Sequence, residues 1–129
     1  MSIPLLIANA LCLLAFGVHT YMGDQELRQL EPASSENTDG KRQIWTQVRC
    51  GWHWVSVDLL LATIGLSLLN FTSYFTHPDT IQQLLSLYFL AYAVVWAITI
   101  ALSRSFSQNF LKLGQWGLLL LLAGLIYWG

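Results

Sequence analysis

Long apolar runs alternate with shorter polar segments along the chain, at residues 3–21, 52–71, 81–102 and 110–128. Each run holds about 20 residues, the length that a helix rising ~1.5 Å per residue needs to cross a ~30 Å hydrocarbon core. The runs are apolar on all sides rather than on one stripe, which is typical of helices that lie in lipid. The pattern therefore predicts an all-α, integral membrane, up-down-up-down four-helix bundle, with residues 1–129 as one domain.

The polar segment between the first two runs is also helical by pattern. Residues 23–31 are good helix formers that Pro32 closes, residues 33–40 have the composition of a turn, and a helical pattern resumes at Lys41 and continues into the second run. We expect helices 1 and 2 to extend out of the membrane as a hairpin with its tip near residues 32–40. Two short helices lying on the membrane surface fit the amphipathic pattern nearly as well.

Apolar residues mark one side of each arm of the predicted hairpin. Leu27 and Leu30 lie on one side of the first arm, and Ile44, Trp45 and Val48 form a stripe on the second. Both the hairpin and the surface-lying arrangement would use these stripes.

Composition and charge fit a membrane protein and orient it. Of the 129 residues, 55% are hydrophobic and 10% are charged, which leaves no room for a second, soluble domain. The six basic residues lie in or beside two of the connections. Four lie between runs one and two (Arg28, Lys41, Arg42 and Arg49), and Arg104 and Lys112 flank the turn between runs three and four. Because cytoplasmic connections carry the excess of Lys and Arg, we expect both termini outside and both of these connections in the cytoplasm. No basic stripe is present, so nucleic acid is not an expected partner, whereas the lipid bilayer is.

Two histidines provide the first candidate site. His19 ends the first run and His53 opens the second, so antiparallel helices would bring them to a similar height. Glu26 lies on the face of His19 and Arg49 on the face of His53, in reach of a salt bridge. Paired imidazoles on adjacent helices suit the axial ligation of haem b, or a divalent metal ion with Glu26 or Asp58 as a further ligand. The alternative is that each histidine lies in the headgroup layer or bonds a backbone carbonyl.

Asp58 is the one acidic residue clearly inside a predicted span, where an unpaired charge costs several kcal/mol. It fits either a proton-carrying carboxylate or a group that orients a histidine ligand. The alternative is an interhelical hydrogen bond to Ser103, Thr99 or Gln115 that sets the helix register. Ser103 and Gln115 are therefore candidate supporting residues, together with Arg49.

Three classes of function fit these residues. The leading hypothesis is a haem- or metal-binding membrane protein that uses His19 and His53. The second is a non-catalytic accessory subunit of a larger membrane complex, with a homo-oligomer as a related arrangement. The third is a small proton-coupled carrier that acts through Asp58. The sequence contains no phosphate-binding loop, nucleophile elbow or His-Glu-x-x-His motif, so no enzyme class is indicated.

Three segments resemble a family of small four-helix bacterial inner-membrane proteins without a known activity: residues 19–23 (HTYMG), 26–30 (ELRQL) and 49–53 (RCGWH). In that family a His-x-x-x-Gly segment follows helix 1 and an Arg-x-x-Trp-His segment opens helix 2. The resemblance implies a bacterial inner membrane as location but no activity, and members often read Leu-Arg-Pro-Leu where this chain has Gln29. It singles out the following residues: His19, Gly23, Arg49, Trp52 and His53.

Overall fold

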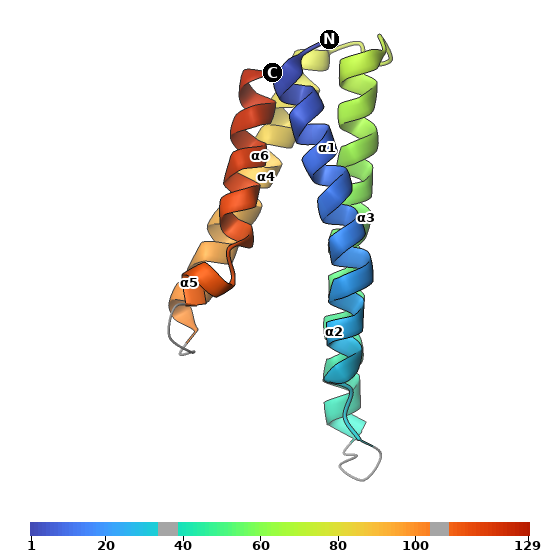
Figure 1. The fold of residues 1–129 in the computed structure, drawn as a ribbon, viewed down its shortest axis with the longest axis vertical. Coiled ribbons are helices and arrows are strands. Elements are labelled where there is room, and N and C mark those ends of the chain that lie inside the picture. The colour runs from blue at the N-terminus through green and yellow to red at the C-terminus, as the bar shows by residue number, and fades with distance from the viewer. Residues whose placement is uncertain (34–38, 104–108) are drawn as a thin grey trace. The chain divides into compact units, whose positions relative to one another are not determined.

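The computed structural model describes residues 1–33, 39–103 and 109–129, and every regular element within these ranges is helical. The elements are α1 (Ile3–Val18), the π-helix η1 (His19–Gly23), α2 (Asp24–Gln29), α3 (Asp39–Phe71), α4 (Pro78–Leu102), α5 (Asn109–Lys112) and α6 (Gln115–Trp128) (Figure 1). The all-α prediction is confirmed for this part of the chain.

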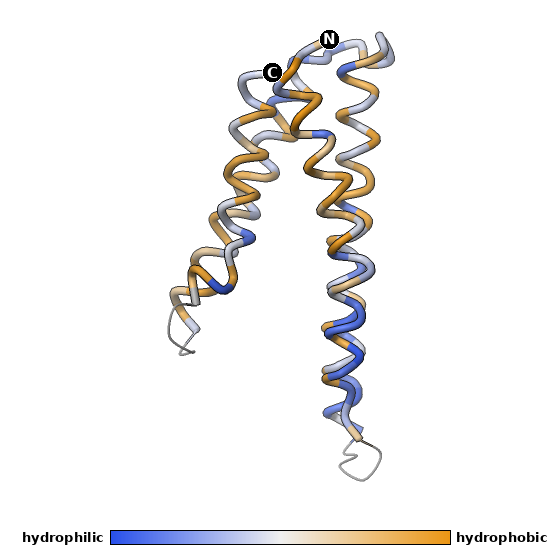
Figure 2. Tube along the Cα trace, viewed as in Figure 1, coloured by the Kyte–Doolittle hydropathy of each residue, from blue (hydrophilic) through white to orange (hydrophobic). Residues whose placement is uncertain are grey.

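Three helical stretches are long and apolar enough to cross a membrane: Ile3–Gln29, Asp39–Phe71 and Pro78–Leu102. The helix α6 is equally apolar but holds only 14 residues. Figure 2 shows hydrophobic residues along most of these helices and a hydrophilic stretch on α2 and the first turns of α3. Length and composition therefore indicate a membrane protein.

The polar extension of the first two runs is helical, as the sequence pattern predicts. The helix that begins at Ile3 continues through η1 and α2 to Gln29, and α3 runs without a break from Asp39 to Phe71. The two arms are joined by a hydrogen bond from Trp45 Nε1 to the carbonyl oxygen of Leu27, 3.0 Å long. The predicted tip at residues 32–40 falls largely on residues 34–38, which lie outside the described ranges.

The apolar stripes of the two arms are only partly buried by this contact. Leu27 is buried and Trp45 is half-buried, but Leu30, Ile44 and Val48 are exposed. The arms therefore meet along a line that passes through Trp45 and leaves the other members of the stripe uncovered.

The fourth apolar run differs from the single helix predicted over residues 110–128. It forms a short α5 and then α6, separated by a turn at Leu113 and Gly114. The indole Nε1 of Trp116 donates to the carbonyl oxygen of Phe110 (3.0 Å), and Gly117 N donates to Gly114 O (3.0 Å). Glycine in a helix interior is destabilising, so Gly114 favours a break in the helix, and these local hydrogen bonds stabilise the turn that forms there.

The described chain divides into two compact units. Unit 1 holds Met1–Asn9 and Gly65–Gly129, and unit 2 holds Ala10–Ile64. In unit 1, α4 packs on α6, where Ser86 Oγ donates to the carbonyl oxygen of Ala123 (2.8 Å). Buried apolar residues fill this contact: Phe89, Ala93, Leu122, Ala123 and Ile126.

The start of the chain is fastened to the end of α3 inside unit 1. Asn70 Oδ1 accepts from Ser2 N (2.6 Å), and its Nδ2 donates back to Ser2 O (3.2 Å). One turn lower, Asn9 Nδ2 donates to Ser67 Oγ (2.7 Å). These amide bonds give α1 and α3 a common register at this end.

Candidate functional site

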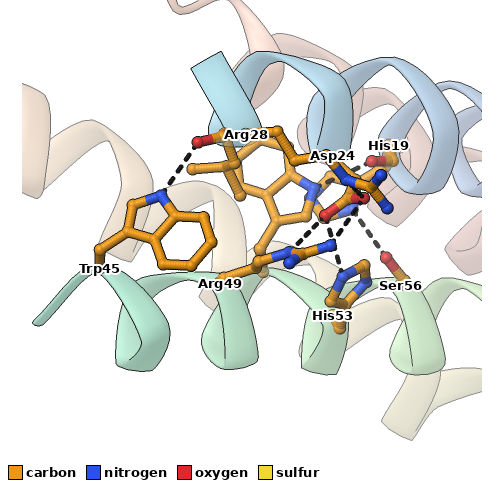
Figure 3. Close-up of polar contacts among 9 residues, drawn as sticks. His19, Asp24, Arg28, Trp45, Arg49, His53 and Ser56 are labelled. Atoms are coloured by element: carbon orange, nitrogen blue, oxygen red, sulfur yellow. Dashed lines mark hydrogen bonds and ion pairs between the residues drawn. The ribbon is translucent and has the colours of Figure 1, made fainter. Parts of the chain in front are cut away.

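A buried carboxylate, Asp24, is the centre of a polar cluster in unit 2 (Figure 3). Its Oδ1 accepts a hydrogen bond from Arg49 Nε at 2.7 Å, and its Oδ2 accepts from Arg28 Nε at 2.8 Å and from Arg49 Nη2 at 3.1 Å. The Nε2 atom of His53 lies 3.2 Å from Oδ1. One carboxylate from α2 is thus held by three cationic or ionisable side chains, two of them on α3.

Hydrogen bonds to guanidinium groups set the charge of this cluster. Asp24 and Arg49 both lie outside the apolar runs that the sequence predicts as spans, residues 3–21 and 52–71. The hydrogen bond from Arg49, aided by Arg28 and opposed by burial, lowers the pKa of Asp24 to about 2. The same bond raises the pKa of Arg49 above its usual range. Asp24 is therefore ionised at neutral pH, and the two arginines leave the cluster with one excess positive charge.

His19 lies beside this cluster and is fixed from two sides. Its ring stacks on Trp52 with centroids 4.1 Å apart and planes 7° apart. Its Nδ1 makes a 3.0 Å hydrogen bond with Ser56 Oγ, and its carbonyl oxygen accepts from Trp52 Nε1 at 2.9 Å. The imidazole ring and the backbone of His19 are therefore both held by residues of α3.

The π-helical turn explains this arrangement. In an α-helix, side chains five residues apart, such as His19 and Asp24, point about 140° apart. A turn closed by i→i+5 hydrogen bonds brings residues at this spacing toward the same side, and turns of this type are frequent at functional sites. Both side chains consequently contact α3.

Gly23 is needed at this turn because Trp52 lies against it. A Cβ on Gly23 would lie 2.7 Å from Cε2 and 2.8 Å from Nε1 of the Trp52 indole. Distances this short are not tolerated by carbon atoms in contact. The residues of the HTYMG and Arg-x-x-Trp-His segments therefore meet in space, with glycine at the closest approach.

The acidic partner of Arg49 differs from the one predicted. Helical spacing placed Glu26 on the face of His19, but Glu26 is exposed and Asp24 occupies the position beside Arg49. The extra residue in the π-helical turn shifts the register, so counting by the α-helical period selected the wrong carboxylate. One signal in the sequence pointed to Asp24: its i, i+4 spacing to Arg28.

Of the predicted site residues, the structure brings together His19, Arg49 and His53. Asp58 is half-buried further along α3 and makes contacts of its own. Ser103 Oγ donates to the carbonyl oxygen of Thr99 in its own helix (2.7 Å), and Gln115 is exposed at the start of α6. Both residues belong to unit 1, whereas the cluster belongs to unit 2.

Within the part of the chain that the structure describes, no three His, Cys, Asp or Glu side chains are already grouped as a metal site. The two imidazoles use one ring nitrogen each in the contacts above, Nδ1 in His19 and Nε2 in His53. Among the described residues, neither His19 Nε2 nor His53 Nδ1 has a hydrogen bond.

Comparisons of the chain with protein-family models, with curated proteins and with solved structures find no match.

Proposed function

We propose that this protein binds a divalent transition-metal ion through His19 and His53, as a four-span protein of a bacterial inner membrane. In this proposal both termini lie outside and the arms formed by α2 and the first turns of α3 project into the cytoplasm. The location rests on the family resemblance. The orientation rests on the six basic residues, which lie in or beside the two connections expected inside.

The observation that carries the proposal is the anchoring of both imidazoles. Metal-binding histidines are oriented by a partner on the nitrogen that does not bind the metal, and a carboxylate or hydroxyl often fills that role. Ser56 holds Nδ1 of His19, and Asp24 holds Nε2 of His53. Each imidazole therefore keeps the opposite nitrogen for a ligand.

The surroundings of the two histidines do not suit haem. A porphyrin needs a wide apolar slot between its two axial ligands. His53 instead lies beside the ionised Asp24 and the guanidinium of Arg49, and one face of the His19 ring is covered by Trp52. Imidazole nitrogen suits zinc, copper and nickel, with water at the remaining positions.

A titration of the purified protein with Co²⁺ in mild detergent tests the proposal, because ligated Co²⁺ absorbs visible light and reports its donors. We expect saturable binding of one ion, weakened at least tenfold in His19→Ala and in His53→Ala. His77→Ala is the matched control, since His77 is exposed next to α4, outside the cluster. It should bind like the wild type.

Three results would contradict the proposal. The first is a wild-type protein that binds no Co²⁺, Zn²⁺ or Cu²⁺ saturably. The second is unchanged binding in both histidine variants, with circular dichroism showing that they are folded. The third is a haem band that forms on adding haem and is lost in both histidine variants, which would make haem the ligand in place of the ion.

A further inference from the structure

Two guanidinium groups lie side by side at the carboxylate of Asp24, within unit 2. Arg28 Nε and Arg49 Nη2 both donate to Oδ2, at 2.8 and 3.1 Å, the first from α2 and the second from α3 (Figure 3). Like charges this close repel each other unless anions neutralise them. The single charge of Asp24 balances only one arginine, and His53, 3.2 Å from Oδ1, adds a further positive charge whenever it is protonated. The pair therefore favours a second anion.

The two arginines keep N–H donors for such an anion. A guanidinium carries five N–H donors, and among the described residues Arg28 uses only the one on Nε. The Arg28 side chain is 63% exposed. That of Arg49 is 30% exposed, and its Cζ lies 5.5 Å from the centroid of the Trp45 ring. Arg28 thus offers accessible donors beside a guanidinium that Asp24 and Trp45 hold in place.

Other carboxylates do not take the place of the second anion. Glu26 is exposed and, within the described ranges, forms no ion pair with either arginine. The charge of Glu31 acts on Arg49, but Glu31 is exposed as well, so solvent screens this interaction. The local excess of positive charge is consequently left to a ligand from outside the chain.

The cluster lies at the depth of lipid headgroups. Asp24 follows the apolar run 3–21 and Arg49 precedes the run 52–71, each by three residues or about 4–5 Å of helix. The headgroup layer is about 5–8 Å thick on each side of the hydrocarbon. Arg28 reaches back one turn to Asp24, so its guanidinium lies at the same level. The exposed rings of Tyr21 and Trp54 mark the edge of the hydrocarbon, as aromatic side chains commonly do.

We propose that Arg28 and Arg49 bind the phosphate group of an anionic phospholipid in the adjoining leaflet. Guanidinium groups pair with phosphate oxygens through charge-assisted, often forked hydrogen bonds. Basic groups between membrane helices are a usual site for anionic headgroups. The lipid shares no donor atom with the proposed metal site, which uses imidazole nitrogens, and its negative charge offsets the excess of the two arginines.

Native mass spectrometry of the purified protein in a neutral detergent with EDTA tests this lipid site. Given equal amounts of phosphatidylglycerol and phosphatidylcholine with identical acyl chains, the wild type should retain one phosphatidylglycerol with a preference of about fivefold. Arg28→Gln should abolish the preference and stay folded, because Arg49 still holds Asp24 with two hydrogen bonds. Arg42→Gln removes the same charge from an exposed position of α3 outside the cluster, and as the matched control it should keep the preference.

Inorganic phosphate distinguishes a lipid headgroup from a free anion. Phosphatidylglycerol should raise the unfolding temperature of the wild type and of Arg42→Gln but not that of Arg28→Gln. Sodium phosphate without lipid should have no more effect than sodium chloride at the same ionic strength. Equal retention of the two lipids by the wild type, or an equal loss of preference in both arginine variants, would overturn the proposal. So would stabilisation by phosphate alone that Arg28→Gln abolishes, since a free phosphate would then be the ligand.

Discussion

Gly23→Ala probes the closest approach between the π-helical turn and α3. A methyl group at Gly23 would press into the Trp52 indole, 2.7 Å from Cε2 and 2.8 Å from Nε1. The ring cannot move aside freely, because it is stacked on His19 and donates to the His19 carbonyl oxygen. The substitution must therefore displace Trp52 or open the turn.

The expected magnitude combines three contributions. Replacing glycine by alanine in a helix favours the folded state by about 1 kcal/mol. Overpacking a filled contact costs about 1–3 kcal/mol. Loss of the hydrogen bond from Trp52 costs about 1 kcal/mol more. Gly23→Ala should therefore lower the free energy of unfolding by about 1–3 kcal/mol, the sum of these contributions.

Gly17→Ala, two residues before η1, is the matched control. A Cβ at Gly17 would meet nothing within 4 Å, so only the helix propensity acts and the variant should be as stable as the wild type or more so. The assay is unfolding by SDS in mixed micelles, followed by circular dichroism. If both alanine variants unfold together with the wild type, Trp52 does not constrain Gly23 and the account of the π-helical turn is wrong.

The other predictions concern the charges and the metal ligands. Asp24→Asn removes the ion pairs that join α2 to α3, so proteases should cut the two arms faster, whereas Glu26→Gln, at an exposed carboxylate, should behave like the wild type. Because the pKa of Asp24 falls from its usual 3.8 to about 2, its ion pairs stabilise the fold fully above pH 4 and are lost as the pH falls toward 2. Resistance to pepsin should drop across that range in the wild type, and a drop of equal size in Asp24→Asn would assign it to other groups. Ser56→Ala removes the group that orients His19, so Co²⁺ affinity should fall about 10–100-fold while the far-UV circular dichroism spectrum stays the same. An unchanged affinity would contradict the proposed orientation of this ligand.

Much of the fold followed from the sequence because long apolar runs have few alternatives. Counting residues from the ends of the first two runs predicts His19 and His53 at a similar height, and in the structure His19 stacks on Trp52, the neighbour of His53 in sequence. The continuous helix through Lys41 also follows from a local pattern.

The rest depends on contacts that a periodic pattern does not contain. The π-helical turn forms where Trp52 contacts Gly23. Because of this turn, Asp24 is the acidic residue of the cluster, whereas the helical period predicts Glu26. Similarly, the break at Gly114 depends on a bond from Trp116 to Phe110 that no hydropathy pattern includes.

The central claim is that His19 and His53 bind one metal ion, and X-ray absorption at the zinc edge tests it most directly. With one equivalent of Zn²⁺ bound, the account predicts two imidazole nitrogens at ~2.0–2.1 Å, decreasing to one in His19→Ala and in His53→Ala. A zinc shell of oxygen alone, or a shell that keeps its imidazoles in both variants, would contradict the claim.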